Sequence, residues 1–322
     1  MAMALLPGLG NFGICWGIIA QIQAAAASSD TTRIHMVTFT SDERYAERFK
    51  ASLTAKERYA EFWGYTWEVF TDNSIDCDKF RAFRWRGDFR YCKLEALKTI
   101  WRRVKRLQKT APDPAIRDYI FWHDVDTHIM RPELPLTSFL AKAKYAPVVF
   151  TDNALSLNNG VFFLQVDEGI GKAFYSAWRK GCRTGEWPWA DNGCMYEVLL
   201  QHLGKDRYQG ACSRFRQEFD ETRPEPPTGE QLMSCFNSQM DAMGMGCCDR
   251  QVEGFAFLTG TEDAFNHHPC QELERRKELQ EFDRELIRAH CFKEGMFMAH
   301  SKDTTYGEES LKRAALLSRQ EL

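Results

Sequence analysis

Hydrophobic and polar positions near the start of the chain alternate between strand-like and helix-like spacing. β-Rich runs at residues 34–39 and 66–70 flank a stretch of helical spacing. That helix is predicted to begin at Ser41 or Asp42, either of which can cap its first turn, and to end at Gly64. The pattern therefore predicts a strand, a helix and a second strand in succession.

A longer helix is predicted over residues 91–107, because its apolar side chains recur at helical spacing. Those that share one face are Leu94, Leu97, Ile100, Trp101, Val104 and Leu107. The proline-containing residues 111–114 end this helix, and an apolar strand that runs into Asp124 follows. Strands that alternate with helices at this spacing are typical of an α/β fold.

Beyond Asp124 the pattern is less regular. It predicts strands at residues 147–150, 160–165, 254–258 and 296–299, and helices near residues 169–179, 191–202, 271–289 and 308–317. Between Gly204 and about Cys248 the spacing fits neither period, so no element is assigned there. The sequence contains no internal repeat.

Size and charge exclude some classes of protein. The chain has 322 residues, enough to bury a sizeable core in one large or two small domains. Lysine and arginine total 42 against 45 aspartate and glutamate, which gives a net charge of -3. This balance provides no basic surplus for nucleic acid, so no nucleic-acid partner is expected.

Residues 1–29 have the composition of a targeting segment. The first charged side chain is Asp30, and the preceding residues are mostly apolar or small. The pattern predicts a signal peptide, with a signal anchor as the close alternative, although Pro7 and several glycines weaken a membrane-spanning helix. A disordered or core-packed N-terminus remains open as well. Membrane contact is expected only through such an anchor.

The cysteine count favours an oxidising compartment. Of 11 cysteines, Cys15 lies in the targeting segment, which leaves an even ten. The sequence does not give their pairing, and zinc-type spacing is absent. Residues 319–322 are similar to a retrieval signal at the last two positions, although chance similarity explains this as well. We expect the secretory pathway, in the lumen of the Golgi or endoplasmic reticulum.

The strand at residues 119–122 leads into two carboxylates, Asp124 and Asp126. Side chains two residues apart in an extended segment point the same way, so these carboxylates converge. Two such oxygen ligands can hold Mn²⁺ or Mg²⁺ and leave coordination positions open for the phosphates of a substrate. A solvated turn is the alternative, but the apolar strand before it and the polar clusters after it favour a metal site.

Three more polar clusters lie near predicted strand or helix ends, where open α/β sheets bind ligands. They are Asn158–Asn159–Gly160, Asp191–Asn192 and His300. Each has a structural alternative. The first can be a hairpin turn, the second can place Asp191 as a helix N-cap, and His300 can be a packed core histidine.

In this order the motifs resemble those of GT-A-type glycosyltransferases, in particular the fungal α-galactosyl/mannosyltransferase and plant xyloglucan xylosyltransferase family. The similarity spans residues 34–302. It rests on the segments VTFT (37–40), YAEFWGY (59–65), YCKLEAL (91–97), FWHDVDTHIM (121–130), LNNGVFFLQ (157–165), ADNGCMYEVL (190–199) and FMAHSKD (297–303).

The resemblance implies a GT-A-like α/β fold for residues 30–322, with a central, mostly parallel sheet flanked by helices. It also implies transfer of a hexose or pentose from a UDP- or GDP-sugar to a glycan or glycoprotein acceptor, with retention of configuration. A Mn²⁺ or Mg²⁺ ion would be bound by Asp124, Asp126 and His300. The donor would be bound by Thr38, Lys93, Asp124, Asp126, Asn158, Asn159, Gly160 and Lys302, with Asp191 and Asn192 catalytic.

The chain departs from the family pattern at two positions. Asn192 stands where the family usually has glutamine, and the glycine that tends to follow the last histidine is replaced by Ser301. The acidic tract that binds the acceptor in the family has no match. Two other readings stay open: a metal-dependent phosphohydrolase, and a glycosyltransferase-like protein that has lost activity and serves as a secreted or scaffold protein.

Overall fold

The computed structural model describes residues 32–77, 89–152, 157–183, 187–216, 228–244, 250–258, 268–270, 291–294 and 296–317. Three predicted features lie outside these residues: the targeting segment 1–29, the charged helix at residues 271–289 and the C-terminal residues 319–322. Within the described residues, no helix is both long and apolar enough to cross a membrane.

The first part of the chain forms the strands and helices that its sequence predicts, except that the single helix predicted between Ser41 and Gly64 is divided at Phe49 into two helices. They are β1 (Thr32–Thr40), α2 (Glu43–Arg48), α3 (Lys50–Trp63), β2 (Thr66–Thr71), α4 (Cys92–Thr110) and β3 (Arg117–His123). Asp42 is the N-cap of α2, since its carboxylate accepts a hydrogen bond from the Tyr45 amide at 2.7 Å. Gly64 ends α3 with φ of 69°, a conformation that glycine adopts at little cost.

The helix predicted over residues 91–107 is α4, with one correction to its apolar face. Leu94, Leu97, Ile100, Trp101 and Val104 are buried, but Leu107 is 43% exposed. Leu107 lies in the last turn of α4, beyond the buried part of that face. Spacing alone therefore extended the buried face one turn too far.

The later elements are β4 (Thr127–Ile129), α5 (Leu136–Lys142), β5 (Val148–Asp152), β6 (Leu157–Gln165), α6 (Ile170–Gly181), α7 (Asp191–Gly204), α8 (Gly229–Ala242), β7 (Arg250–Val252), β8 (Phe255–Leu258), β9 (Met298–His300) and α11 (Thr305–Leu317). The segment left unassigned by the sequence contains α8. A capping box formed by Thr228 and Gln231 starts this helix.

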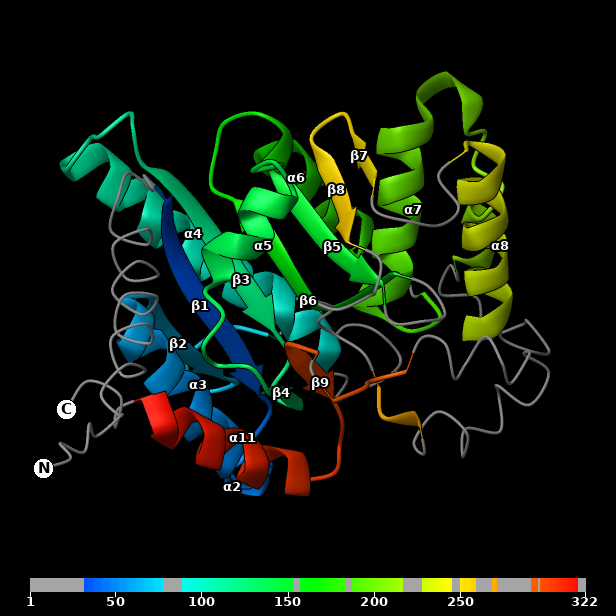
Figure 1. The fold of residues 1–322 in the computed structure, drawn as a ribbon. Helices are drawn as coiled ribbons and strands as arrows, with labels where there is room; N and C mark the ends of the chain where they lie inside the picture. Colours follow the sequence, from blue (N-terminus) through cyan, green and yellow to red (C-terminus); the bar gives the residue numbers. More distant parts are fainter. Residues whose placement is uncertain are drawn as a thin grey trace, which may run out of the picture.

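The strands form a mixed sheet with the order β2-β1-β3-β6-β5-β8-β7 (Figure 1). β1 is parallel to β2 and β3, and β5 is parallel to β8, whereas β6 and β7 run antiparallel to their neighbours. All of the sheet except β6 and β7 therefore runs in one direction, so the predicted mostly parallel sheet is confirmed. β4 and β9 form a separate antiparallel pair at one edge.

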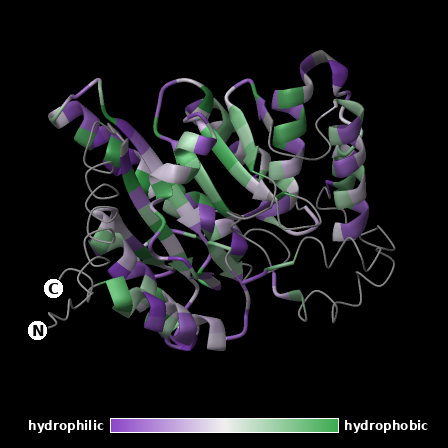
Figure 2. Cartoon of the chain, in the orientation of Figure 1, coloured by the Kyte–Doolittle hydropathy of each residue, from purple (hydrophilic) through white to green (hydrophobic). Residues whose placement is uncertain are grey.

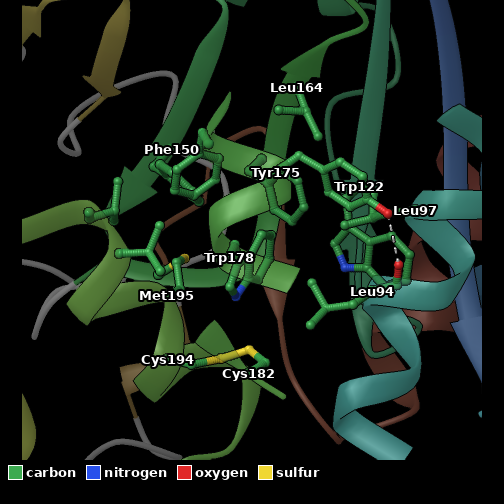
Figure 3. Packing of buried hydrophobic residues seen from close by; sticks show 14 of the residues in the cluster. Leu94, Leu97, Trp122, Phe150, Leu164, Tyr175, Trp178, Cys182, Cys194 and Met195 are labelled. Carbon is green, nitrogen blue, oxygen red and sulfur yellow. Dashed lines mark hydrogen bonds between the residues drawn. A yellow bond between two sulfur atoms is a disulfide. The ribbon is translucent and has the colours of Figure 1, made fainter. Parts of the chain in front are cut away.

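Helices cover both faces of this sheet. α4, α6 and α7 pack on one face, where Trp122 and Leu164 of the strands lie in one hydrophobic cluster with Leu97 and Trp178 of the helices (Figure 3). α3 and α5 pack on the other face, and α11 packs against α3. Figure 2 shows the same arrangement by hydropathy: the strands in the centre are mostly hydrophobic (green), and hydrophilic residues (purple) lie on the outer faces of the helices. The architecture is consistent with the GT-A-like α/β fold expected from the sequence.

Four disulfides are present among the described residues: Cys77–Cys92, Cys182–Cys194, Cys212–Cys235 and Cys270–Cys291. The even number of cysteines predicted disulfides but not which residues pair. Four disulfides fit an oxidising environment such as that of the secretory pathway.

Asp118 forms a buried polar cluster at the beginning of β3. Its carboxylate accepts hydrogen bonds from Arg33 (2.5 Å) and Gln108 (2.9 Å) and contacts His35 Nε2 at 3.0 Å. Burial alone would raise the pKa of Asp118, but the hydrogen bonds from His35, Arg33 and Gln108 lower it well below its usual range. The cluster joins β1, β3 and α4 at the end of β3 opposite to Asp124.

We predict that Asp118→Asn lowers the free energy of unfolding at pH 7 by about 1.5–3 kcal/mol, because it removes the charged acceptor of the hydrogen bonds from Arg33, His35 and Gln108. The pKa of Asp118 is lower in the folded chain than in the unfolded chain. Its ionised form therefore adds stability that is complete above about pH 4 and is lost as the pH falls further. Urea unfolding at pH 7 and pH 3 should show a smaller difference between variant and wild type at pH 3. The exposed Asp113→Asn is the control, and equal effects of the two variants at pH 7 would contradict the prediction.

Candidate active site

The Asp124–Asp126 motif lies in a tight turn between β3 and β4. The Thr127 hydroxyl donates to the Asp124 carbonyl at 2.7 Å, and the Asp124 amide donates to the Gly160 carbonyl at 2.6 Å. Lys56 donates from α3 to the carbonyls of Asp124 and Val125 at 3.0 and 3.1 Å. The turn is therefore held by β6 on one side and by α3 on the other, and it is not a solvated turn.

Lys56 is a site residue that the sequence analysis did not identify. Its side chain is fully buried, and burial lowers its pKa to about 7, although Asp126 and Asp124 oppose this effect. The available signal was its position on the buried face of α3, four residues after Ser52. A lysine on the inner face of a helix needs a polar partner, and the carbonyls of the turn provide it.

Asp124, Asp126 and His300 can hold a metal ion. One ligand atom from each lies within 4.8 Å of the others. Pairing of β4 with β9 places His300 opposite Thr127, and His300 Nε2 lies 3.3 Å from the Asp126 carboxylate. His300 is therefore not merely a packed core histidine, because its imidazole faces a carboxylate.

The donor set fits a divalent ion that prefers oxygen and imidazole nitrogen. Asp124 Oδ1 already accepts from Trp122 Nε1 at 2.8 Å and lies 3.2 Å from Lys93 Nζ, which leaves Oδ2 for coordination. Burial alone would raise the pKa of Asp126, but His300 and Lys56 lower it well below its usual range. Asp126 therefore stays ionised, as a metal ligand must.

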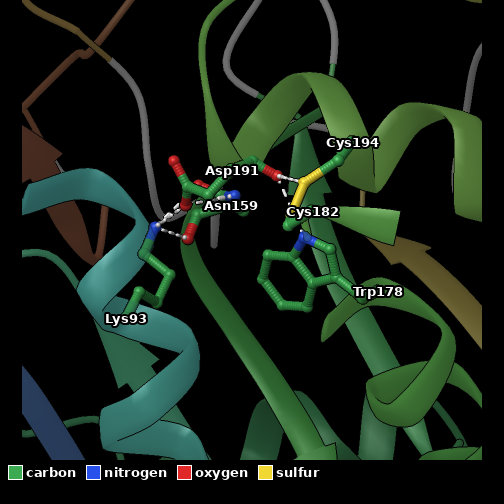
Figure 4. The surroundings of a disulfide bond; sticks show 6 residues. All are labelled: Lys93, Asn159, Trp178, Cys182, Asp191 and Cys194. Carbon is green, nitrogen blue, oxygen red and sulfur yellow. Dashed lines mark hydrogen bonds and ion pairs between the residues drawn. A yellow bond between two sulfur atoms is a disulfide. The ribbon is translucent and has the colours of Figure 1, made fainter. Parts of the chain in front are cut away.

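A second cluster adjoins the first and is centred on Lys93, at the start of α4 (Figure 4). Lys93 Nζ lies 3.1 Å from the Asp191 carboxylate and 3.2 Å from Asp124. It also donates to the side-chain and backbone oxygens of Asn159, at 2.7 and 2.9 Å. The Lys93 residue is only 5% exposed, so its ammonium is surrounded mainly by protein groups.

The charges of this cluster depend on one another. Burial raises the pKa of Asp191, and Asp124 adds to the effect, whereas the Lys93 ammonium opposes it. Burial alone would lower the pKa of Lys93, but the two carboxylates raise it above its ordinary value. Lys93 is therefore charged at neutral pH and compensates two negative groups.

The structure excludes the reading of Asp191 as the N-cap of α7 and leaves its catalytic role a prediction. The N-cap of α7 is Ala190, which makes no side-chain cap, so Asp191 is not the cap. Instead its carboxylate accepts a hydrogen bond from Asn159 Nδ2 at 2.7 Å. Asn192 also faces this cluster, since its side-chain oxygen accepts from the Asn159 amide at 3.0 Å.

The hairpin-turn reading of Asn158–Asn159–Gly160 is wrong, because these residues lie inside β6. β6 runs antiparallel to β3, so its first residues reach the edge of the sheet where β3 ends. The Asn158 side chain turns back to its own strand and accepts from the Gly160 amide at 2.6 Å.

Two residues predicted to bind the donor do not contact this cluster. Thr38 is fully buried in β1, and its hydroxyl has no hydrogen-bond partner among the described residues. Lys302 is exposed beyond β9, and its carbonyl accepts a hydrogen bond from Arg48 at 2.9 Å. Their contact with a donor remains a prediction.

His268 is another residue that the sequence analysis did not identify. Its ring stacks on His300, with the centroids 4.5 Å apart, and it is buried. The backbone next to it is fixed by the Cys270–Cys291 disulfide and by the Phe292 amide, which donates to the His268 carbonyl at 2.8 Å. No spacing in the sequence links residue 268 to residue 300, since only the fold brings them together.

No family model matches the chain, and no curated protein matches it. The chain is similar to a solved structure described as the crystal structure of a glycosyltransferase involved in the glycosylation of the major capsid of PBCV-1. The TM-score is 0.35 and the sequence identity is 15%, over 53% of this chain and 78% of that chain. A likeness of this extent carries no argument about activity, so the chemistry of the site must support any function.

We predict that Asp126→Asn and His300→Ala each raise the dissociation constant for Mn²⁺ by at least about tenfold, because each removes one ligand. Titration with Mn²⁺ followed by electron paramagnetic resonance measures this without any substrate. Asp303→Asn is the matched control, since Asp303 is an exposed carboxylate just beyond β9. Unchanged Mn²⁺ binding in folded Asp126→Asn and His300→Ala would show that these residues do not form a metal site.

Proposed function

We propose that this protein is a metal-dependent glycosyltransferase that uses a nucleotide sugar. One observation carries the proposal: the possible metal ligands Asp124, Asp126 and His300 adjoin the buried cluster of Lys93, Asn159 and Asp191 at the end of β3. A transferase of this kind needs an acidic metal site for a diphosphate and polar groups for the sugar beside it. The motif order in the sequence supports the same reading.

Asp124, Asp126 and His300 would bind Mn²⁺ or Mg²⁺, and the ion would neutralise the negative charge that grows on the leaving nucleotide. The protein groups orient that site. Trp122 and Lys93 fix one oxygen of Asp124, and the Ser301 amide fixes the Asp126 carbonyl at 2.8 Å. Their positions are set before any ligand binds, which lowers the cost of organising the transition state.

Asp191 and Asn192 are proposed to lie near the reacting carbon of the donor sugar. Both begin α7 and both face Asn159. In this arrangement Lys93 links the metal site to Asp191, because its ammonium contacts the carboxylates of Asp124 and Asp191. Retention of configuration, a hexose or pentose as the transferred sugar and UDP or GDP as its carrier rest on the family resemblance.

The acceptor is proposed to be a glycan or a glycoprotein, in the lumen of the Golgi or endoplasmic reticulum. The disulfides support an oxidising compartment. Residues 1–29 are proposed to direct the chain there, as a signal peptide or a signal anchor. Binding sites for the donor at Thr38, Asn158 and Lys302 belong to the same proposal.

We predict that the double variant Asp124→Asn, Asp126→Asn abolishes metal-dependent release of nucleotide while the protein stays folded. Each substitution removes a charged ligand with little change in volume, and Asp191 still compensates Lys93. The measurement is UDP or GDP release from a panel of nucleotide sugars with and without Mn²⁺, with circular dichroism to verify folding. Metal-dependent turnover that persists in the double variant would remove the basis for this site.

The same panel separates the other candidate functions. Release of phosphate from simple monoesters, with no nucleotide release from sugar donors, would indicate a metal-dependent phosphohydrolase. A folded wild-type protein that binds Mn²⁺ but acts on no donor would indicate a protein that has lost activity and serves another role.

We also predict that the native protein from a eukaryotic host lacks its first residues and carries disulfides instead of free thiols. The sequence has no Asn-x-Ser/Thr acceptor site, so N-glycosylation cannot report its passage through the secretory pathway. Mass spectrometry of the intact protein gives the mature N-terminus and the number of free thiols. An intact Met1 together with all cysteines free would contradict the proposed compartment.

A further inference from the structure

The first turn of α7, which carries Asp191 and Asn192, begins from a strained backbone. Trp189 and Ala190 have φ of 59° and 53°, a region that residues with a side chain rarely adopt. Such conformations persist only where the surrounding structure fixes them. Ala190 provides no side-chain cap for the helix. The position of Asp191 must therefore be fixed by contacts from other elements.

α6 provides these contacts (Figure 4). Trp178 Nε1 donates to the Asp191 carbonyl at 2.9 Å, and the Cys182–Cys194 disulfide joins the end of α6 to the same turn of α7. Cys194 Sγ lies 3.3 Å from the Asp191 carbonyl, which it contacts without donating because the sulfur carries no hydrogen. Both contacts act on the backbone of Asp191 and leave its carboxylate to Lys93 and Asn159.

The same part of α6 is also bound to α4. Arg179 and Arg183 lie 2.7 and 3.0 Å from the Glu95 carboxylate, which is buried two residues after Lys93. α6 is therefore linked to α4 by ion pairs and to α7 by a disulfide. The contact between Lys93 and Asp191 closes this arrangement of three helices.

Close packing leaves the turn little freedom to move. A Cβ atom on Gly193 would lie 2.1 Å from the Pro188 carbonyl, and one on Gly229 would lie 2.0 Å from the Trp189 ring. The segment before Asp191 is thus packed between α7 and the start of α8. Without the α6 contacts, the remaining restraints on Asp191 are this packing and its side-chain partners.

We propose that Trp178 and the Cys182–Cys194 disulfide are positioning residues of the active site, which hold Asp191 against Lys93 and Asn159 for glycosyl transfer. This rests on the proposed function. It assigns to this disulfide a role in the reaction beyond stability. The metal ligands lie on other elements, so we expect their affinity for metal to change little when the α6 contacts are lost.

The test compares two disulfides in the full chain. Cys182→Ser, Cys194→Ser should lower kcat for nucleotide release roughly 10- to 100-fold, because a small displacement of a reacting group has an effect of this size. Mn²⁺ affinity and donor affinity should change less than about threefold. Cys212→Ser, Cys235→Ser is the control. Its cysteines are 23 residues apart in sequence, against 12 for the first pair, so its loss should lower Tm at least as much.

A milder pair of variants covers the case in which the disulfide variant does not fold. Arg179→Met weakens the link between α6 and α4, and Arg179→Lys keeps the charge. We expect kcat to fall in Arg179→Met and to recover in part in Arg179→Lys, with Mn²⁺ affinity unchanged in both. Equal kcat losses in the two disulfide variants, or wild-type kcat in Cys182→Ser, Cys194→Ser, would overturn the proposal, as would a parallel loss of Mn²⁺ affinity.

Amide hydrogen exchange separates this proposal from the proposed function. If the wild type releases nucleotide from no donor, glycosyl transfer is wrong. Exchange at residues 191–195 still tests the positioning of Asp191. It should be faster in Cys182→Ser, Cys194→Ser than in the wild type and unchanged in Cys212→Ser, Cys235→Ser. Unchanged exchange in the first variant would overturn the role of α6.

Discussion

The Lys93 ammonium lies between the carboxylates of Asp124 and Asp191 and offsets their mutual repulsion. Lys93 contacts both carboxylates within 3.2 Å, and Asp124 contributes to the raised pKa of Asp191. Two like charges in a buried place need a cation or must lose one charge by protonation. Lys93 supplies that cation and contacts both carboxylates. It thereby links the metal site to the start of α7.

The topology of the sheet places these groups together. β3 ends at Asp124, and β6 begins at the same edge because it runs antiparallel to β3. This pairing gives Asn159 two roles, since it binds Lys93 through its oxygens and Asp191 through its nitrogen. An all-parallel sheet would place the beginning of β6 at the opposite edge. One reversed strand therefore completes the site.

Two buried polar groups beside the site, Lys56 and Trp178, act on its backbone. Lys56 holds the turn between Asp124 and Asp126 through two carbonyls, and Trp178 holds the carbonyl of Asp191. Side chains of the site are thus left to face one another and a ligand. This division fits a site that is organised before a substrate binds, where little reorganisation is needed.

The order of strands and helices through Asp124, the pair of carboxylates at a strand end and the presence of disulfides could all be predicted from the amino-acid sequence. These features follow from local spacing and composition, which act over a few residues.

Local spacing also placed Leu107 in the core and allowed Asn158–Gly160 to be a turn. The structure corrects both, because burial and strand pairing depend on distant partners. Tertiary structure alone gives the contacts of Lys56 and His268, the contacts of Lys93 with Asp124, Asn159 and Asp191, and the pairing of the cysteines. Each joins residues far apart in the chain, and no local pattern carries that information.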